Sequence, residues 1–202
     1  MGRPEVIPSK IGVMGTSRGG ELALQLGSIY AQIKAVVAYV PANVRYPSCC
    51  GGEIKAAWTL NGLPIAYALP RQGRTANDLQ AEIPVERIAG PILVVAAESD
   101  GVWPSSGMTM AIQRRLKREH FKYEFVRLAY PHAGHRAGYP VIEPEWSGGL
   151  VHPVSGAEVT LGGTPEGNAA SSLDAIPQVL AFLHRSLAAD GPVPQAEGKE
   201  LP

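Results

Sequence analysis

Lys10-Ile11-Gly12-Val13-Met14-Gly15-Thr16-Ser17-Arg18-Gly19 is the stretch that decides the fold. An apolar run leads into Gly15-Thr16-Ser17-Arg18-Gly19, and a helical pattern follows it. Strand, tight turn and helix are the context that a G-x-S-x-G nucleophile elbow requires. The turn is so sharp that we expect Gly15 and Gly19 where larger side chains would clash. Ser17 would then project from the carboxyl edge of a sheet at a helix N-terminus, which favours developing negative charge. The alternative is an ordinary turn in which Ser17 caps the helix.

Composition limits the classes of function. The chain has 202 residues, enough for one domain with a core of its own. Its 18 basic and 18 acidic residues balance, so no basic field would attract nucleic acid or an anionic membrane. No apolar stretch is long enough to span a membrane, and the first residues lack the apolar core of a signal peptide. The adjacent Cys49 and Cys50 cannot join distant parts of the fold, so we expect reduced thiols and a cytoplasmic location.

Apolar runs alternate with helical patterns along the chain. Short apolar runs cover residues 10–14, 35–40, 91–97 and 123–129, and the middle two are continuous, as is typical of strands buried on both faces. Helical patterns cover residues 20–30, 106–119 and 176–187. This alternation predicts an α/β fold, with a mostly parallel sheet covered by helices on both faces.

Two segments interrupt this alternation. Residues 42–90 are rich in proline and glycine, and we interpret them as a lid-like insertion, with an irregular surface loop as the alternative. Residues 148–170 resemble a second loop on the active-site side. The predicted domain covers residues 1–187, and residues 188–202 are predicted to be a disordered tail.

A nucleophilic serine needs a base, and the base needs an orienting acid. Asp100 follows the third apolar run and His135 follows the fourth, so both are predicted at the strand ends where Ser17 lies. The order Ser, Asp, His is the one expected for this fold. Glu98 remains an alternative acid and His132 an alternative base. Gly134 and Gly138 beside His135 suit a close approach of backbone and favour His135; the other histidines are His120, His152 and His184.

Several motifs together resemble one family. They are residues 11–21 (IGVMGTSRGGE), 90–93 (GPIL), 98–105 (ESDGVWPS), 130–135 (YPHAGH) and 162–165 (GGTP). With them the chain resembles the C-terminal domain of the acyl-CoA thioester hydrolase and bile acid-CoA:amino acid N-acyltransferase family, over most of residues 8–187. The resemblance implies an alpha/beta-hydrolase fold and a catalytic triad of Ser17, Asp100 and His135.

The resemblance also implies a reaction. Members that hydrolyse thioesters mostly use serine and those that transfer the acyl group use cysteine, so Ser17 favours water as the acceptor. The expected activity is cleavage of fatty acyl-CoA, or another acyl ester, to the free acid, with no cofactor and no metal. The alternatives are a non-catalytic truncated fragment and a dienelactone-hydrolase-like esterase acting on small esters.

One departure from the family pattern concerns the start of the chain. The resemblance implies about four strands before the nucleophile strand, whereas residues 1–9 leave no room for them, so we expect the N-terminal strands to be lacking. Only the backbone N–H of Arg18 would then remain as an oxyanion donor, and losing the second donor lowers a rate about 100- to 1,000-fold. The run from Lys10 to Met14 would also have an open edge, through which we expect self-association.

Overall fold

The computed structural model describes residues 3, 6–49, 53–69, 76–140, 149–152 and 156–188. Its central sheet has four parallel strands in the order β1-β2-β5-β6. Their bounds are Ile11–Thr16 for β1, Ile33–Tyr39 for β2, Ile92–Ala97 for β5 and Phe125–Tyr130 for β6. The parallel sheet and its covering helices confirm the predicted α/β class.

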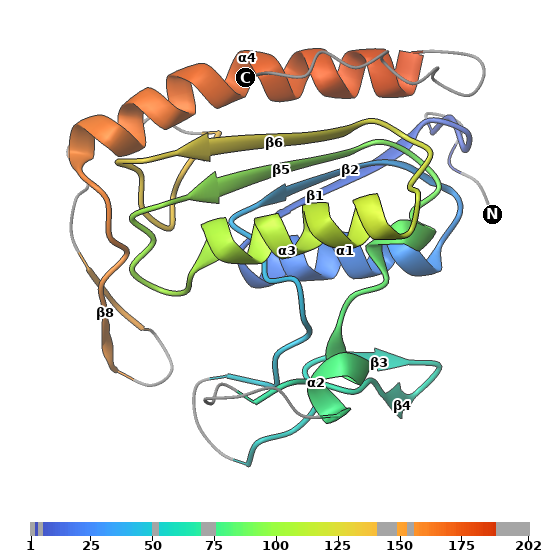
Figure 1. The fold of residues 1–202 in the computed structure, drawn as a ribbon, viewed down its shortest axis with the longest axis horizontal. Helices are drawn as coiled ribbons and strands as arrows, with labels where there is room; N and C mark the ends of the chain where they lie inside the picture. Colours follow the sequence, from blue (N-terminus) through green and yellow to red (C-terminus); the bar gives the residue numbers. More distant parts are fainter. Residues whose placement is uncertain are drawn as a thin grey trace.

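Helices cover both faces of this sheet (Figure 1). Helices α1 (Arg18–Ile29) and α3 (Ser105–Arg118) lie on one face, and α4 (Pro165–Ala188) lies on the other. Leu24 of α1 and Ile112 of α3 pack against Val36 and Val94, whereas Phe182 of α4 packs against Val37. Alternate residues of β2 thus enter opposite cores, which explains why no charged residue follows Lys34 in this strand.

The last helix begins earlier than the sequence predicted. The pattern indicated a helix over residues 176–187, but α4 starts at Pro165 and continues through Pro177. Proline ordinarily ends a helix because it lacks an N–H and its ring clashes with the preceding turn. Here buried Ser171, Ser172 and Ala175 pack the first half of α4 against the protein, so that half stays helical. The loop predicted at residues 148–170 therefore gives its last six residues to α4; before them lie β7 (Leu150–Val151) and β8 (Glu158–Val159).

Residues 42–90 leave the sheet after β2 and return at β5. They contain the β3–β4 hairpin (Thr59–Leu60 and Leu63–Pro64), helix α2 (Ala76–Ala81) and a 3-10 turn, η1 (Val85–Arg87). In Figure 1 the hairpin and α2 lie beyond α1 and α3, away from the sheet. By contrast, Ile83, Val85 and Ile88 are buried in the core beneath α1 and α3. The end of the predicted insertion therefore belongs to the packed core.

Strand β1 forms one edge of the four-stranded sheet. It pairs with β2 and has no second partner among the described strands. Val13 packs against the core on the α1 side, while Met14 is 49% exposed. Met14 is therefore the exposed apolar side chain of β1, whereas Ile11 and Val13 are half-buried.

The structure also bears on the predicted state of the cysteines and on the prediction of no membrane span. Cys49 is disulfide-bonded, so the expectation of a reduced thiol was wrong at this position; Cys50, the other cysteine of the sequence, lies outside the described residues. Among the described residues, no helix combines the length and apolarity that crossing a membrane requires. Of the tail predicted at residues 188–202, Ala188 is the last residue of helix α4, and residues 189–202 lie outside the described part of the chain.

Candidate active site

The turn between β1 and α1 holds Ser17 in a rarely populated backbone conformation, with φ 57° and ψ −119°. Such strain in a residue other than glycine persists only where the surroundings impose it, and it is typical of functional sites. A side chain on Gly15 would lie 2.2 Å from the Gly19 carbonyl oxygen, so Gly15 must be glycine. A Cβ on Gly19 would meet nothing within 4 Å, and the prediction that crowding requires Gly19 was wrong. The crowded position on the helix side is Gly20, whose Cβ would lie 3.0 Å from the Tyr39 carbonyl oxygen.

The structure brings Ser17, His135 and Asp100 together in one hydrogen-bonded chain. His135 Nδ1 lies 2.9 Å from both carboxylate oxygens of Asp100, and His135 Nε2 lies 2.7 Å from Ser17 Oγ. With Nδ1–H donated to the carboxylate, Nε2 is free to accept the serine hydroxyl proton. The Ser17 side chain makes no capping bond to α1, so the interpretation of Ser17 as a simple helix cap does not hold. This geometry suits activation of a serine nucleophile.

The alternative acid and base lie elsewhere. Glu98 and His132 are exposed, while the side chains of Asp100 and His135 are only 1% and 10% exposed. Parallel strands place catalytic side chains at their carboxyl ends, which restricts the acid to the loop after β5 and the base to the loop after β6. The residue within each loop is then decided by which side chain turns inward.

Asp100 is held by its own loop as well as by His135. Its Oδ1 accepts the backbone N–H groups of Val102 and Trp103, at 2.9 and 3.2 Å. The Trp103 ring meets the His135 imidazole edge-on with 5.2 Å between ring centroids, and its indole N–H donates to the Val40 carbonyl oxygen at 2.9 Å. Trp103 thus fixes one side of the imidazole. Trp103 belongs to the sequence motif D-G-V-W, but the motif alone did not predict this contact.

A fully buried carboxylate, Glu21, lies one helical turn after Ser17. It pairs with the Arg18 guanidinium and accepts the Trp58 indole N–H and the Tyr46 backbone N–H. Burial raises the pKa of the Glu21 carboxyl above its ordinary value of 4.5, while these donors and the Arg18 charge act in the opposite direction. Glu21 therefore joins the nucleophile helix to the segment that leaves β2.

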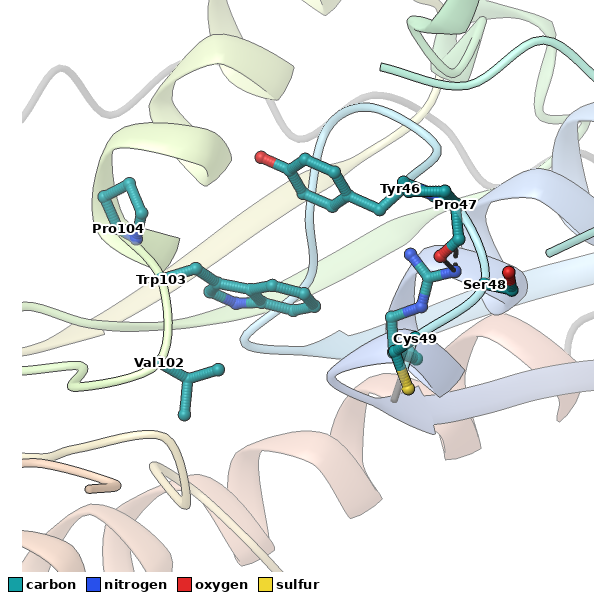
Figure 2. Close-up of a pocket in the computed structure, with 8 residues that line it drawn as sticks. Tyr46, Pro47, Ser48, Cys49, Val102, Trp103 and Pro104 are labelled. Carbon is teal, nitrogen blue, oxygen red and sulfur yellow. Dashed lines mark hydrogen bonds between the residues drawn. The ribbon is translucent and has the colours of Figure 1, made fainter. Parts of the chain in front are cut away.

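That segment forms one wall of a pocket of about 460 Å³. Figure 2 shows Val102, Trp103 and Pro104 on one side and residues 46–49 on the other. The Tyr46 and Trp103 rings stack at 5.9 Å, and Arg18 Nη2 donates to the carbonyl oxygens of Tyr46 and Pro47 at 2.9 and 3.1 Å. The guanidinium charge is thus satisfied from within the protein, and the remaining lining is mainly apolar.

Three contributions to this site had no sequence signal of their own. Two of them, Tyr46 and Trp58, lie in the segment of residues 42–90, which has no periodic pattern. The third, Glu21, is far from both in the sequence. Only the position of Glu21 in a motif could have drawn attention to it. In the described part of the chain, no cluster of three or more His, Cys, Asp or Glu side chains could hold a metal ion.

Comparisons with known proteins show what the chain as a whole is similar to. The family model described as BAAT / Acyl-CoA thioester hydrolase C terminal matches residues 1–189. Acyl-coenzyme A thioesterase 2, mitochondrial, of Rattus norvegicus is 33% identical over 198 residues, which are 92% of this chain and 42% of that protein. Acyl-coenzyme A thioesterase 1 of Homo sapiens is 27% identical over 209 residues, 96% of this chain and 48% of that protein. The chain spans about half the length of the curated relatives it matches.

Solved structures show the same fold at low sequence identity. The acylaminoacyl peptidase of Pyrococcus horikoshii superposes with a TM-score of 0.56 at 14% identity, covering 98% of this chain and 26% of that one. A puromycin-hydrolyzing peptidase of Mycobacterium tuberculosis gives a TM-score of 0.52 at 15% identity, covering 94% and 23%. At these identities the likeness concerns the fold alone.

Proposed function

The chain belongs to the BAAT / Acyl-CoA thioester hydrolase C-terminal family, and from this premise we propose that it hydrolyses acyl-CoA thioesters with Ser17 as the nucleophile. The observation that carries the proposal is the hydrogen bond of 2.7 Å between Ser17 Oγ and His135 Nε2, made by a serine in a strained elbow. A hydroxyl is a weak nucleophile until a base removes its proton. The proposal therefore depends on this contact.

The reaction proceeds in two halves. As Ser17 Oγ attacks the thioester carbonyl carbon, His135 Nε2 accepts the hydroxyl proton, and Asp100 stabilises the resulting imidazolium through Nδ1–H. The tetrahedral intermediate expels the coenzyme A thiolate, which takes the proton from His135. A water molecule then gives a proton to His135 and attacks the acyl-serine, which releases the carboxylic acid and restores the Ser17 hydroxyl.

The developing oxyanion needs donors at the same strand end. Arg18 is the first residue of α1, so its backbone N–H has no acceptor within the helix and serves this role in the proposed mechanism. The acyl group would lie in the mainly apolar pocket beside Trp103, because the Arg18 guanidinium there is already neutralised by Glu21.

A fluorophosphonate probe and thioester turnover test the proposal together. The purified chain is expected to gain one probe mass on the peptide that contains Ser17, and to release thiol from acyl-CoA. Ser17→Ala should lose both, while Ser48→Ala, which changes a pocket serine, should keep the label. Full labelling of Ser17→Ala would refute the nucleophile. Labelling and turnover of p-nitrophenyl acetate without turnover of acyl-CoA would refute the substrate class, and absence of labelling in the unmodified chain would favour a non-catalytic protein.

A further inference from the structure

Residues 161–163 lie between the loop that carries Asp100 and the loop that carries His135. The Leu161 carbonyl oxygen accepts the backbone N–H of His135 at 2.7 Å and that of Gly101 at 3.0 Å. One oxygen atom therefore bonds both the base itself and the residue that follows the acid. Any displacement of this carbonyl would change the position of Asp100 relative to His135.

The next two residues continue this connection along both loops. Gly162 forms an antiparallel bridge with Asp100, and Gly163 forms one with Ala133. The segment thus pairs with the acid loop on one side and with the histidine loop on the other. In this way a short strand-like segment joins the loop after β5 to the loop after β6.

The link leaves no space for side chains. Gly162 and Gly163 have φ values of +72° and +73°, which favour glycine. A Cβ on Gly162 would lie 2.0 Å from the Ser99 carbonyl oxygen, and one on Gly163 would lie 2.2 Å from the Gly134 backbone nitrogen. Backbone is therefore packed directly against backbone at both positions.

The first turn of α4 makes a further bond to the histidine loop. Asn168 Oδ1 accepts the backbone N–H of Gly134, the residue before His135, at 2.8 Å, and the Thr164 N–H donates to the His132 carbonyl oxygen at 2.9 Å. Gly134 is buried, so without Asn168 its N–H would have to find another acceptor. Asn168 thereby connects the position of α4 to that of the base.

Resting on the proposed function, we propose that residues 161–163 and Asn168 form a clamp that positions the Asp100–His135 pair for proton transfer. None of these residues touches the Ser17 hydroxyl, so they act as positioning residues. Loops that follow different strands are not held together by the sheet ladder, and a misplacement of about 1 Å can lower a rate about 100-fold. Ser99 already joins the two loops, because its N–H donates to the Ala133 carbonyl oxygen at 3.2 Å and its hydroxyl donates to the Pro131 carbonyl oxygen at 2.8 Å. The clamp adds connections at Gly101, Gly134 and His135, next to the acid and at the base itself.

Asn168 offers the sharpest test because its side chain can be changed without altering the backbone. Asn168→Ala should lower kcat about three- to tenfold, in keeping with one lost hydrogen bond, and leave KM unchanged. Asn168→Asp replaces the amide oxygen with a carboxylate oxygen that can still accept the Gly134 N–H, and it should keep kcat near the wild-type value. Gln178→Ala removes an amide side chain elsewhere on the same helix and should leave kcat unchanged.

A second readout is independent of turnover. In protein labelled with ¹⁵N-histidine, exchange of the His135 Nδ1–H proton with solvent should be faster in Asn168→Ala and return to the wild-type rate in Asn168→Asp. Unchanged exchange in Asn168→Ala would overturn the clamp, whether or not the chain hydrolyses thioesters. Absence of thioester turnover, combined with altered exchange, would refute the proposed function and leave the clamp standing.

A glycine pair extends the test to the backbone link. Gly162→Ala should lower the rate of fluorophosphonate labelling at Ser17 more than Asn168→Ala does, because its Cβ displaces the acid loop. Gly107→Ala is the matched control, since a Cβ there meets nothing within 4 Å. Equal labelling rates for folded Gly162→Ala and Gly107→Ala, with unchanged His135 Nδ1–H exchange, would overturn the role of the glycine pair.

Discussion

Removing the buried carboxylate of Glu21 is expected to destabilise the protein strongly. The Glu21→Ala variant would leave the Arg18 guanidinium, which is 27% exposed, without its ion-pair partner. It would also leave the Trp58 indole N–H and the Tyr46 backbone N–H without their acceptor. Breaking a buried ion pair from one side costs about 3–5 kcal/mol, and the partial exposure of Arg18 favours the lower end. This is a large share of a net stability of about 5–15 kcal/mol.

Thermal unfolding followed by circular dichroism measures this loss. For a chain of this length, about 3 kcal/mol corresponds to a melting temperature lowered by about 6–12 °C. Glu53→Ala is the control, because Glu53 pairs with Lys55 at an exposed site where an ion pair contributes at most about 1 kcal/mol. Equal melting temperatures for the two variants would refute the conclusion that Glu21 anchors the pocket wall.

The raised pKa of Glu21 adds a pH dependence to the same experiment. Burial raises the pKa in the folded state above 4.5, so the folded protein binds the proton more tightly than the unfolded chain does. The contribution of Glu21 protonation to stability is therefore complete below pH 4.5 and is lost as the pH rises through the folded-state pKa. The stability advantage of the wild type over Glu21→Gln should accordingly be larger on the acid side of that range. A stability difference between wild type and Glu21→Gln that increases with pH would show that the folded protein favours the ionised carboxylate. That result would contradict the raised pKa.

Two further predictions concern the base and the edge of the sheet. His135→Ala should lower kcat more than about 10⁴-fold, whereas exposed His132→Ala should change it about twofold or less; the reverse ranking in a turnover assay would refute the assignment. Light scattering should find the chain associated through the open edge of β1, and Met14→Lys should shift it towards the 21.4 kDa monomer; a wild-type monomer would contradict this.

The sequence was sufficient to predict the core of the fold because the two inner strands, β2 and β5, are buried on both faces. Such strands are nearly continuous in apolar residues, and the runs at residues 35–40 and 91–97 stand out for that reason. The proximity of Ser17, Asp100 and His135 could be predicted because each lies in the connection that follows one of the strands. Parallel strands bring their carboxyl ends to one edge, so the order of Ser17, Asp100 and His135 along the chain already places them together.

The surroundings of the site could not be predicted in the same way. The Leu161 carbonyl oxygen contributes through its backbone, and a backbone acceptor has no signature in a sequence. The start of α4 was missed because Pro177 ordinarily ends a helix, and only the tertiary packing of Ser171 and Ala175 outweighs that local preference. Glycine is required at Gly20, not at Gly19, because the carbonyl oxygen of Tyr39 at the end of β2 lies close to Gly20. This is a contact between two different elements, which a local sequence pattern does not predict.

Four strands carry or separate the residues of the proposed site. Ser17 follows β1, Asp100 lies in the loop after β5 and His135 in the loop after β6, and β2 lies between β1 and β5. The bond from the Trp103 indole to the Val40 carbonyl oxygen makes that spacer part of the site, because it ties the acid loop to the end of β2. The bonds of residues 161–163 do the same for the acid and histidine loops. Four strands therefore fix the order of the site residues, and cross-connections between the loops fix their distances. On this argument the activity should respond to changes in those connections more than to changes within the sheet ladder.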